Sequence, residues 1–204
     1  QRKWTTYFIP PLIIRCCNLL TKIGIPRKQI VNVPLIHPLP MWTDLTDIFI
    51  SDFSIPNPKL SSCKQVQAAF KHLQHKYKNF TEIFTDGSVV IEPERSAAAA
   101  IAVCTDAGFD TRNWKLGCEC SIFTAELFAI WQALLYVTKY IHSGIGIVVY
   151  TDSLSSVMAL QNHKPSANLS LLFSILDLIK DLLTRFPVKI QYIPAHQNID
   201  GNEL

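Results

Sequence analysis

The chain has 204 residues, of which 49% are hydrophobic and 17% are charged, a composition that excludes an intrinsically disordered protein. Its length allows one ordinary domain with a substantial extra piece, or two small domains. The apolar run from Pro11 to Leu20 is interrupted by Arg15 and falls short of the roughly 20 residues that a membrane helix needs, so we expect no membrane partner.

The net charge of +3 conceals an asymmetry along the chain. Residues 1–80 carry 11 Lys and Arg against 3 Asp and Glu, whereas residues 81–204 carry 8 against 13. The basic front half indicates either contact with a polyanion or a solubilising surface. The acidic rear half would repel nucleic acid unless its carboxylates hold cations, which is a first indication of metal chemistry.

The six cysteines show neither a repeated CxxC pair nor zinc-ligand spacing with histidine. Reduced thiols predict an intracellular protein of the cytoplasm or the nucleus rather than a secreted one. The chain begins at Gln1 without an initiator methionine, a basic leader or a cleavage site, so we interpret it as a fragment of a longer protein.

Residues 1–80 read as a Pro-rich, basic linker segment. Eight of the 12 prolines fall within the first 60 residues and interrupt any helix or central strand. Short apolar runs at Leu12–Ile14 and Ile48–Ile50 could pack against a neighbour. Apolar residues at three- and four-residue steps predict one helix near residues 62–78.

From residue 81 onward the pattern predicts an α/β domain, covering residues 81–204, with a mixed five-stranded sheet flanked by helices. Strands and helices follow in the order strand, strand, strand, helix, strand, short helix, long helix, strand. The expected strands are Glu82–Val90, Ala97–Cys104, Thr111–Cys118, Ile147–Tyr150 and Val188–Ile193, and the expected helices run from Ser121 to Tyr140, from Ser153, and over Leu169–Phe186.

Asp86 lies within the first strand, in the segment Phe84-Thr85-Asp86-Gly87-Ser88. A carboxylate in an apolar strand costs several kcal/mol unless it is paired or bound to a cation. Gly87 follows, and there the backbone can approach a ligand closely. An ordinary Asp-Gly-Ser turn is the alternative for this segment.

Glu126 precedes Ile130 by four residues and Leu134 by eight, so it lies on the apolar stripe of its helix and points inward. A favourable interaction with the helix dipole would explain an exposed glutamate better than an inward one. Asp152 ends the buried strand, where ligands of α/β sheets bind, although a helix cap is the alternative. His196 follows the last strand, which should lie near Asp152, and an ordinary loop histidine is the alternative.

The order of these segments resembles the type 1 ribonuclease H family, and most closely the ribonuclease H domains of non-LTR retrotransposon polyproteins. The resemblance covers about residues 81–204, and residues 1–80 are similar, more loosely, to the Pro-rich stretch that joins reverse transcriptase to ribonuclease H in such elements. Four segments carry it: Phe84-Thr85-Asp86-Gly87-Ser88, Phe123-Thr124-Ala125-Glu126-Leu127, Tyr150-Thr151-Asp152-Ser153, and Ile193-Pro194-Ala195-His196 with Gly201-Asn202-Glu203.

The resemblance implies endonucleolytic cleavage of the RNA strand of an RNA–DNA hybrid by two-metal-ion hydrolysis, in a polyprotein with an upstream reverse transcriptase. It implies that Asp86, Glu126 and Asp152 bind two Mg²⁺ or Mn²⁺ ions, for which carboxylate oxygens are suitable ligands. His196 is expected to assist proton transfer or product departure. Gly87 and Ser88 are expected to contact 2′-hydroxyl groups of the RNA.

Two features depart from the family pattern. A fourth carboxylate follows G-N-E in the pattern G-N-E-x-A-D and would fall just beyond Leu204, so we expect a domain truncated at its C-terminus and a fragment that is weak or inactive. The segment Gln161–Leu169 offers only His163 and Lys164 where some members carry a basic protrusion. The alternative function is therefore a catalytically inactive scaffold that binds nucleic acid or protein.

Overall fold

The computed structural model describes residues 22, 47–53, 55, 61–91, 94–162, 168–199 and 201. The chain divides into two compact units, Gln1–Ile36 and His37–Leu204, and every element described below belongs to the second. In chain order these elements are β1 (Phe49–Ile50), α2 (Cys63–Lys76), β2 (Thr81–Val90), β3 (Ser96–Thr105), β4 (Gly108–Leu116), α3 (Ile122–Tyr140), β5 (Ile147–Thr151), α4 (Leu154–Asn162), α5 (Leu169–Leu183) and β6 (Val188–Tyr192).

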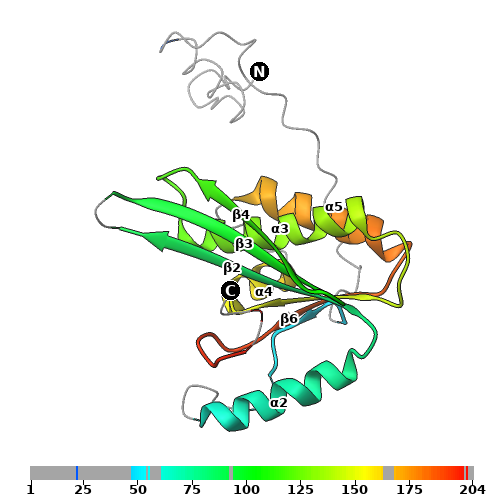
Figure 1. The fold of residues 1–204 in the computed structure, drawn as a ribbon. Coiled ribbons are helices and arrows are strands. Elements are labelled where there is room, and N and C mark those ends of the chain that lie inside the picture. The colour runs from blue at the N-terminus through cyan, green and yellow to red at the C-terminus, as the bar shows by residue number, and fades with distance from the viewer. Residues whose placement is uncertain are drawn as a thin grey trace, which may run out of the picture. The chain divides into compact units, whose positions relative to one another are not determined.

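The six strands form one mixed sheet in the order β1-β6-β5-β2-β3-β4, with helices on both faces (Figure 1). Strands β2, β3 and β4 are antiparallel neighbours, whereas β5 and β6 run parallel to β2 and to one another. All five residues of β5 are buried, which explains why its sequence is a continuous apolar run. Parallel pairing brings the carboxyl ends of β5 and β6 to the same edge of the sheet.

Helices α3 and α5 cover one face of the sheet and close the larger core. Helix α3 begins after Ser121, whose side chain accepts a hydrogen bond from the N–H of Thr124 at 3.1 Å. The buried stripe of α3 packs on alternate residues of β2 and β3, including Ile83 and Ile101. This packing fixes the helix start, and therefore Glu126, against the middle of β2.

Helix α2 lies on the opposite face of the sheet (Figure 1). Its buried side chains are Val66, Phe70 and Leu73. The Phe70 ring lies 5.1 Å from that of Tyr150, edge to face, and 6.1 Å from that of Phe84. Aromatic pairs at such distances stabilise packing beyond the area they bury. The helix is thus an integral layer of the fold.

The predicted fold class is confirmed, with one correction to the number of strands: the sheet has six strands, not five. The additional strand β1 is only two residues long and adds to β6 through a hydrogen bond from the Ile190 N–H to the Ile48 carbonyl. So short a strand has no periodicity that a sequence can show. Its Phe49 side chain is nevertheless buried, so the Ile48–Ile50 run does pack against a neighbour.

The third strand of the antiparallel sheet is also placed differently from expectation. It runs Gly108–Leu116 rather than Thr111–Cys118, because Thr105 pairs with Gly108 and leaves a two-residue turn between β3 and β4. The division of the chain at residue 80 remains a prediction. The Leu12–Ile14 run and most of the proline-rich segment lie outside the described residues, and no helix in the described part of the chain is long and apolar enough to cross a membrane.

Replacing Phe70 with alanine tests whether α2 is part of the folded unit. We expect Phe70→Ala to lower the free energy of unfolding by about 3–5 kcal/mol, because it empties the contact between α2 and the sheet. The exposed His72 of the same helix is the control, and His72→Ala should change stability by less than about 0.5 kcal/mol. If chemical denaturation showed an equally small loss of stability for both variants, the packing of α2 on the sheet would be contradicted.

Candidate metal centre

Asp86 lies on the face of β2 that is turned away from α3. Its neighbours Thr85 and Gly87 are buried beneath the helix, whereas Asp86 itself is exposed. This alternation follows from the two-residue period of a strand. The turn considered for this segment does not occur, because pairing with β3 continues through Asp86 and beyond to Val90.

Glu126 lies in the second turn of α3 and is only 7% exposed. Its approach to β2 depends on Gly87. A Cβ added to Gly87 would lie 2.5 Å from the backbone nitrogen of Glu126, much closer than such atoms come in proteins. The missing side chain therefore lets the strand and the helix touch backbone to backbone, and it brings two carboxylates together.

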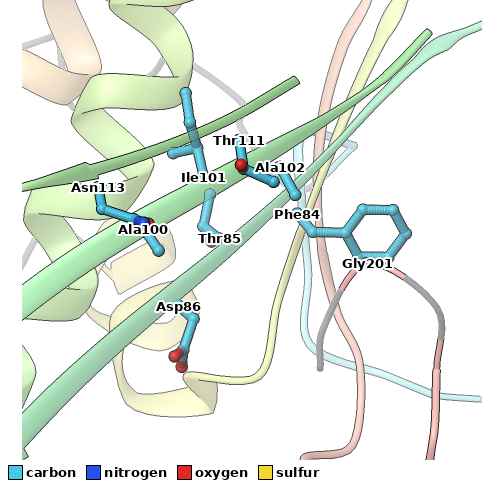
Figure 2. Close-up of a pocket in the computed structure, with 9 residues that line it drawn as sticks. All are labelled: Phe84, Thr85, Asp86, Ala100, Ile101, Ala102, Thr111, Asn113 and Gly201. Carbon is cyan, nitrogen blue, oxygen red and sulfur yellow. The ribbon is translucent and has the colours of Figure 1, made fainter. Parts of the chain in front are cut away.

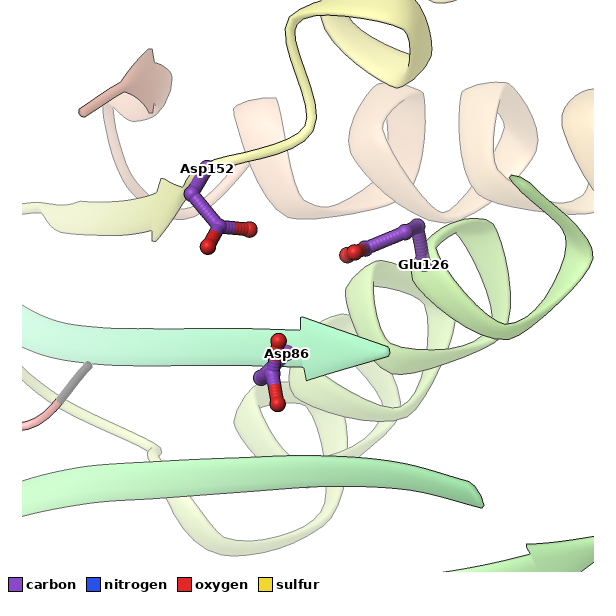
Figure 3. A group of neighbouring side chains, drawn as sticks. All are labelled: Asp86, Glu126 and Asp152. Atoms are coloured by element: carbon purple, nitrogen blue, oxygen red, sulfur yellow. The ribbon is translucent and has the colours of Figure 1, made fainter. Parts of the chain in front are cut away.

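Asp152 follows directly on β5, and the register of the sheet explains why it lies near Asp86. Thr85 of β2 pairs with Thr151 of the parallel strand β5. An aspartate follows each of these two threonines in the sequence. Asp86 and Asp152 therefore occupy matching positions, one residue beyond the last pair of β2 and β5. Figure 3 shows the side chains of Asp86, Glu126 and Asp152 turned toward a common space, and one ligand atom of each lies within 4.8 Å of the others.

The electrostatics of this group are unfavourable without a cation. Burial, together with the nearby charges of Asp152 and Asp86, raises the pKa of Glu126 to about 9. A hydrogen bond from the Gly87 backbone acts in the opposite direction. The Oε2 atom of Glu126 is buried without a hydrogen-bond partner. A carboxylate held in this way is a ready ligand for a hard cation, which would offset both the burial and the repulsion.

Hydroxyl side chains fix the backbone around the end of β5. The buried Thr85 hydroxyl donates to the Tyr150 carbonyl at 3.1 Å and so joins β2 to β5 beside the carboxylates. The Ser153 N–H donates to the Thr151 hydroxyl at 3.3 Å, and the hydroxyls of Ser153 and Ser156 lie 2.8 Å apart. These bonds stabilise the turn from β5 into α4, which presents Asp152.

A pocket of about 220 Å³ opens beside Asp86 on the sheet face opposite α3 (Figure 2). Alanine side chains of β3 form its floor, and Gly201 borders it. A Cβ on Gly201 would lie 2.5 Å from the Phe84 ring, so only glycine allows this loop to approach. Thr111 and Asn113 of β4 supply polar groups to the pocket.

The structure brings Asp86, Glu126 and Asp152 together, and their role as metal ligands remains a prediction. Gly87 and Ser88 follow Asp86 on β2, the first buried against α3 and the second exposed. His196 is exposed in the loop after β6, with a left-handed backbone (φ 55°), and does not belong to the carboxylate group found among the described residues. Asp200, Asn202 and Glu203 lie outside the described residues.

Sequence reasoning missed the polar residues that share the face of Asp86. Asn113 pairs with Ala100, which in turn pairs with Asp86, so the three residues lie in one row across β4, β3 and β2. Their alignment depends on the register of two hairpins. A single sequence does not show that register.

The fold and the site together define a class: an α/β protein with three carboxylates, suited to a cation, where the parallel pairing of two central strands ends beneath a helix. Within that class, the family model for RNase H matches residues 78–204, which is more than half of the chain. The chain belongs to the ribonuclease H family.

Solved structures give similar folds at low sequence identity. The foamy viral protease–reverse transcriptase in complex with double-stranded DNA matches with 20% identity and a TM-score of 0.50, over 62% of this chain and 88% of that chain. LC11 RNase H1 in complex with an RNA/DNA hybrid gives 19% and 0.47, over 61% and 92%. RNase H1 of Halobacterium salinarum NRC-1 gives 17% and 0.45, over 56% and 85%. Comparison with curated proteins gives no match.

Replacing Glu126 with glutamine should stabilise the metal-free protein. The pKa of Glu126 is higher in the folded chain than in the unfolded chain, so the wild-type protein loses stability as the pH rises from about 5 to 9, and the neutral amide does not. In EDTA we expect Glu126→Gln to raise the melting temperature by about 5 °C near pH 8, and by less near pH 5. The exposed Glu119, replaced in the same way, is the control; a gain that is independent of pH would contradict the prediction.

Replacing Gly87 with alanine should separate β2 from α3. The added Cβ meets backbone atoms rather than a flexible side chain, so we expect a loss of about 1–3 kcal/mol in the free energy of unfolding, measured by chemical denaturation. Gly117 is a matched control because a Cβ there meets nothing within 4 Å. If Gly87→Ala retained wild-type stability, the close approach of the two backbones would be wrong.

Proposed function

We propose that the chain is a metal-dependent endoribonuclease that cuts the RNA strand of RNA–DNA hybrids. One observation carries the proposal: in a member of the ribonuclease H family, Asp86, Glu126 and Asp152 place ligand atoms within 4.8 Å of one another. Such an accumulation of negative charge costs stability, and it serves no purpose in a site that only packs.

The three carboxylates fit hard divalent cations. They offer only oxygen ligands, and the buried Oε2 of Glu126 lacks any other partner among the described residues. Oxygen ligands favour Mg²⁺ or Mn²⁺, and two ions are proposed here. When bound, such ions lower the pKa of water and stabilise the charge that develops on the leaving oxygen.

The protein's own groups supply placement and proton transfer in this proposal. Asp86 and Asp152, on and after two adjacent central strands, and Glu126 of α3 would hold the cations. His196, exposed beyond β6, assists proton transfer or product departure from the solvent side. Ser88 and the backbone of Gly87 contact 2′-hydroxyl groups, which distinguishes RNA from DNA.

The biological setting is also part of the proposal. We place the chain in an intracellular retroelement polyprotein, downstream of a reverse transcriptase. The motifs of the sequence support this setting. The foamy viral protein of similar fold is itself a protease–reverse transcriptase, which offers an analogy at the level of the fold.

Cleavage of a hybrid with a labelled RNA strand tests the proposal. We expect cleavage in Mg²⁺ or Mn²⁺ and none in EDTA, and a loss of at least about 1000-fold for Asp86→Asn and for Asp152→Asn, because each removes a charged ligand. The exposed Asp177 of α5 is the control, and Asp177→Asn should cleave normally. A folded protein that neither cleaves hybrid nor gains thermal stability from Mg²⁺ would instead be the inactive scaffold.

A further inference from the structure

The outward surface of α2 is cationic and lacks acidic residues. Helix α2 and the turn that follows it, residues 63–80, contain no Asp or Glu. The apolar side chains pack on the sheet, so the charged ones are exposed to solvent. These exposed basic and imidazole side chains are Lys64, Lys71, His72, His75, Lys76 and Lys78.

Lys64, Lys71 and Lys78 form a row along one side of this surface. They recur every seven residues, which is close to two helical turns, so Lys64 and Lys71 lie about 10.5 Å apart along the axis. Lys78 continues the row in the turn after the helix. Within the described part of the chain the one ion pair is Arg112–Asp110, so no described carboxylate neutralises the lysine row.

The lysine row borders the side of α2 that is hydrogen-bonded to the loop after β6 and to β2. Gln67, one turn from both Lys64 and Lys71, donates to the Asn198 carbonyl at 3.0 Å and so holds the loop that carries His196. Gln74, one turn from both Lys71 and Lys78, donates to Glu82 of β2 at 2.8 Å. The row therefore flanks two segments, the His196 loop and the strand that carries Asp86.

The same sheet face carries both α2 and Asp86. Phe70 of α2 contacts the Phe84 ring, and Asp86 follows Phe84 by two residues, which is about 7 Å along a strand. Asp86 is exposed on that face, as the lysines are. A nucleic-acid duplex bound at Asp86 therefore meets α2 on the same side of the sheet.

We infer that the lysine row of α2 binds the phosphate backbone of the RNA–DNA hybrid, as the substrate-holding surface of the metal centre. This inference rests on the proposed function. Residues 81–204 carry more acidic than basic side chains, so they repel a polyanion except where cations are bound. The lysine row supplies the positive charge that a polyanion requires. Lys64 and Lys71 precede residues 78–204, which match the family model, and Lys78 is the first residue of that match.

Contacts of this kind set affinity rather than the rate of the chemical step. Lysine ammonium groups bind phosphates as point charges, without reading the base sequence. Each such contact releases a counterion, which makes binding weaken with salt. The lysine row is therefore expected to determine KM and its salt dependence, and to leave kcat to the carboxylates.

The test compares two double variants of the full chain. Lys64→Gln with Lys71→Gln removes two charges of the row. Lys139→Gln with Lys180→Gln removes two exposed charges from α3 and α5, on the other side of the sheet. For the first variant we expect KM for the hybrid to rise about tenfold, kcat to stay within twofold, and the slope of log KM against log salt to fall by about 2. The control variant should match the wild type, and equal melting temperatures exclude a folding defect.

Fluorescence anisotropy with a labelled hybrid in EDTA separates this inference from the proposed function, since it needs no cleavage. The inference is supported if the α2 double variant has a higher Kd than the wild type and the control double variant does not. This outcome supports it even if the wild-type chain cleaves nothing and the proposed function fails. Equal Kd, KM and salt slopes for both double variants and the wild type would overturn it. Equal weakening in both double variants would also overturn it, because the charge of the chain as a whole would then explain binding.

Discussion

Three mutually repelling carboxylates are held together by the packing of the sheet against α3. One ligand atom each of Asp86, Glu126 and Asp152 lies within 4.8 Å of the others, and burial together with the charges of Asp152 and Asp86 raises the pKa of Glu126 to about 9. Only a rigid frame can hold such a group in place. The parallel register of β2 and β5 supplies one part of this frame, and the backbone contact at Gly87 supplies the other.

The two faces of the sheet differ in the side chains that they carry. Large apolar side chains of α3 and α5 fill the face beneath Gly87 and form the larger core. On the other face, α2 packs on Phe84 and Tyr150, and a pocket opens beside Asp86, where β3 presents alanines. The two-residue alternation of β2 therefore places Asp86 on the face with the pocket and Gly87 on the face beneath α3.

The segment before the family match is a structural layer rather than a spacer where it is described. Strand β1 extends the sheet at β6, and α2 covers the aromatic side chains of Phe84 and Tyr150. Gln67 holds the loop that carries His196. This layer connects the packing of the fold to the surroundings of the site, and it adds positive charge to a domain whose own charge is negative.

Periodicity and local motifs are properties of neighbouring residues, so the sequence alone predicted the helices and the approximate positions of the five longer strands, and it singled out the three carboxylates as candidates. Glu126 could be assigned an inward direction from its place on the apolar stripe alone. Tertiary structure decided what depends on register and on contacts between distant residues: the sixth strand at Phe49–Ile50, the alignment of Asn113 with Asp86, and the packing of α2 beside the site. These features arise from pairing across the sheet, and no local pattern in a single chain specifies which strand or which register will pair.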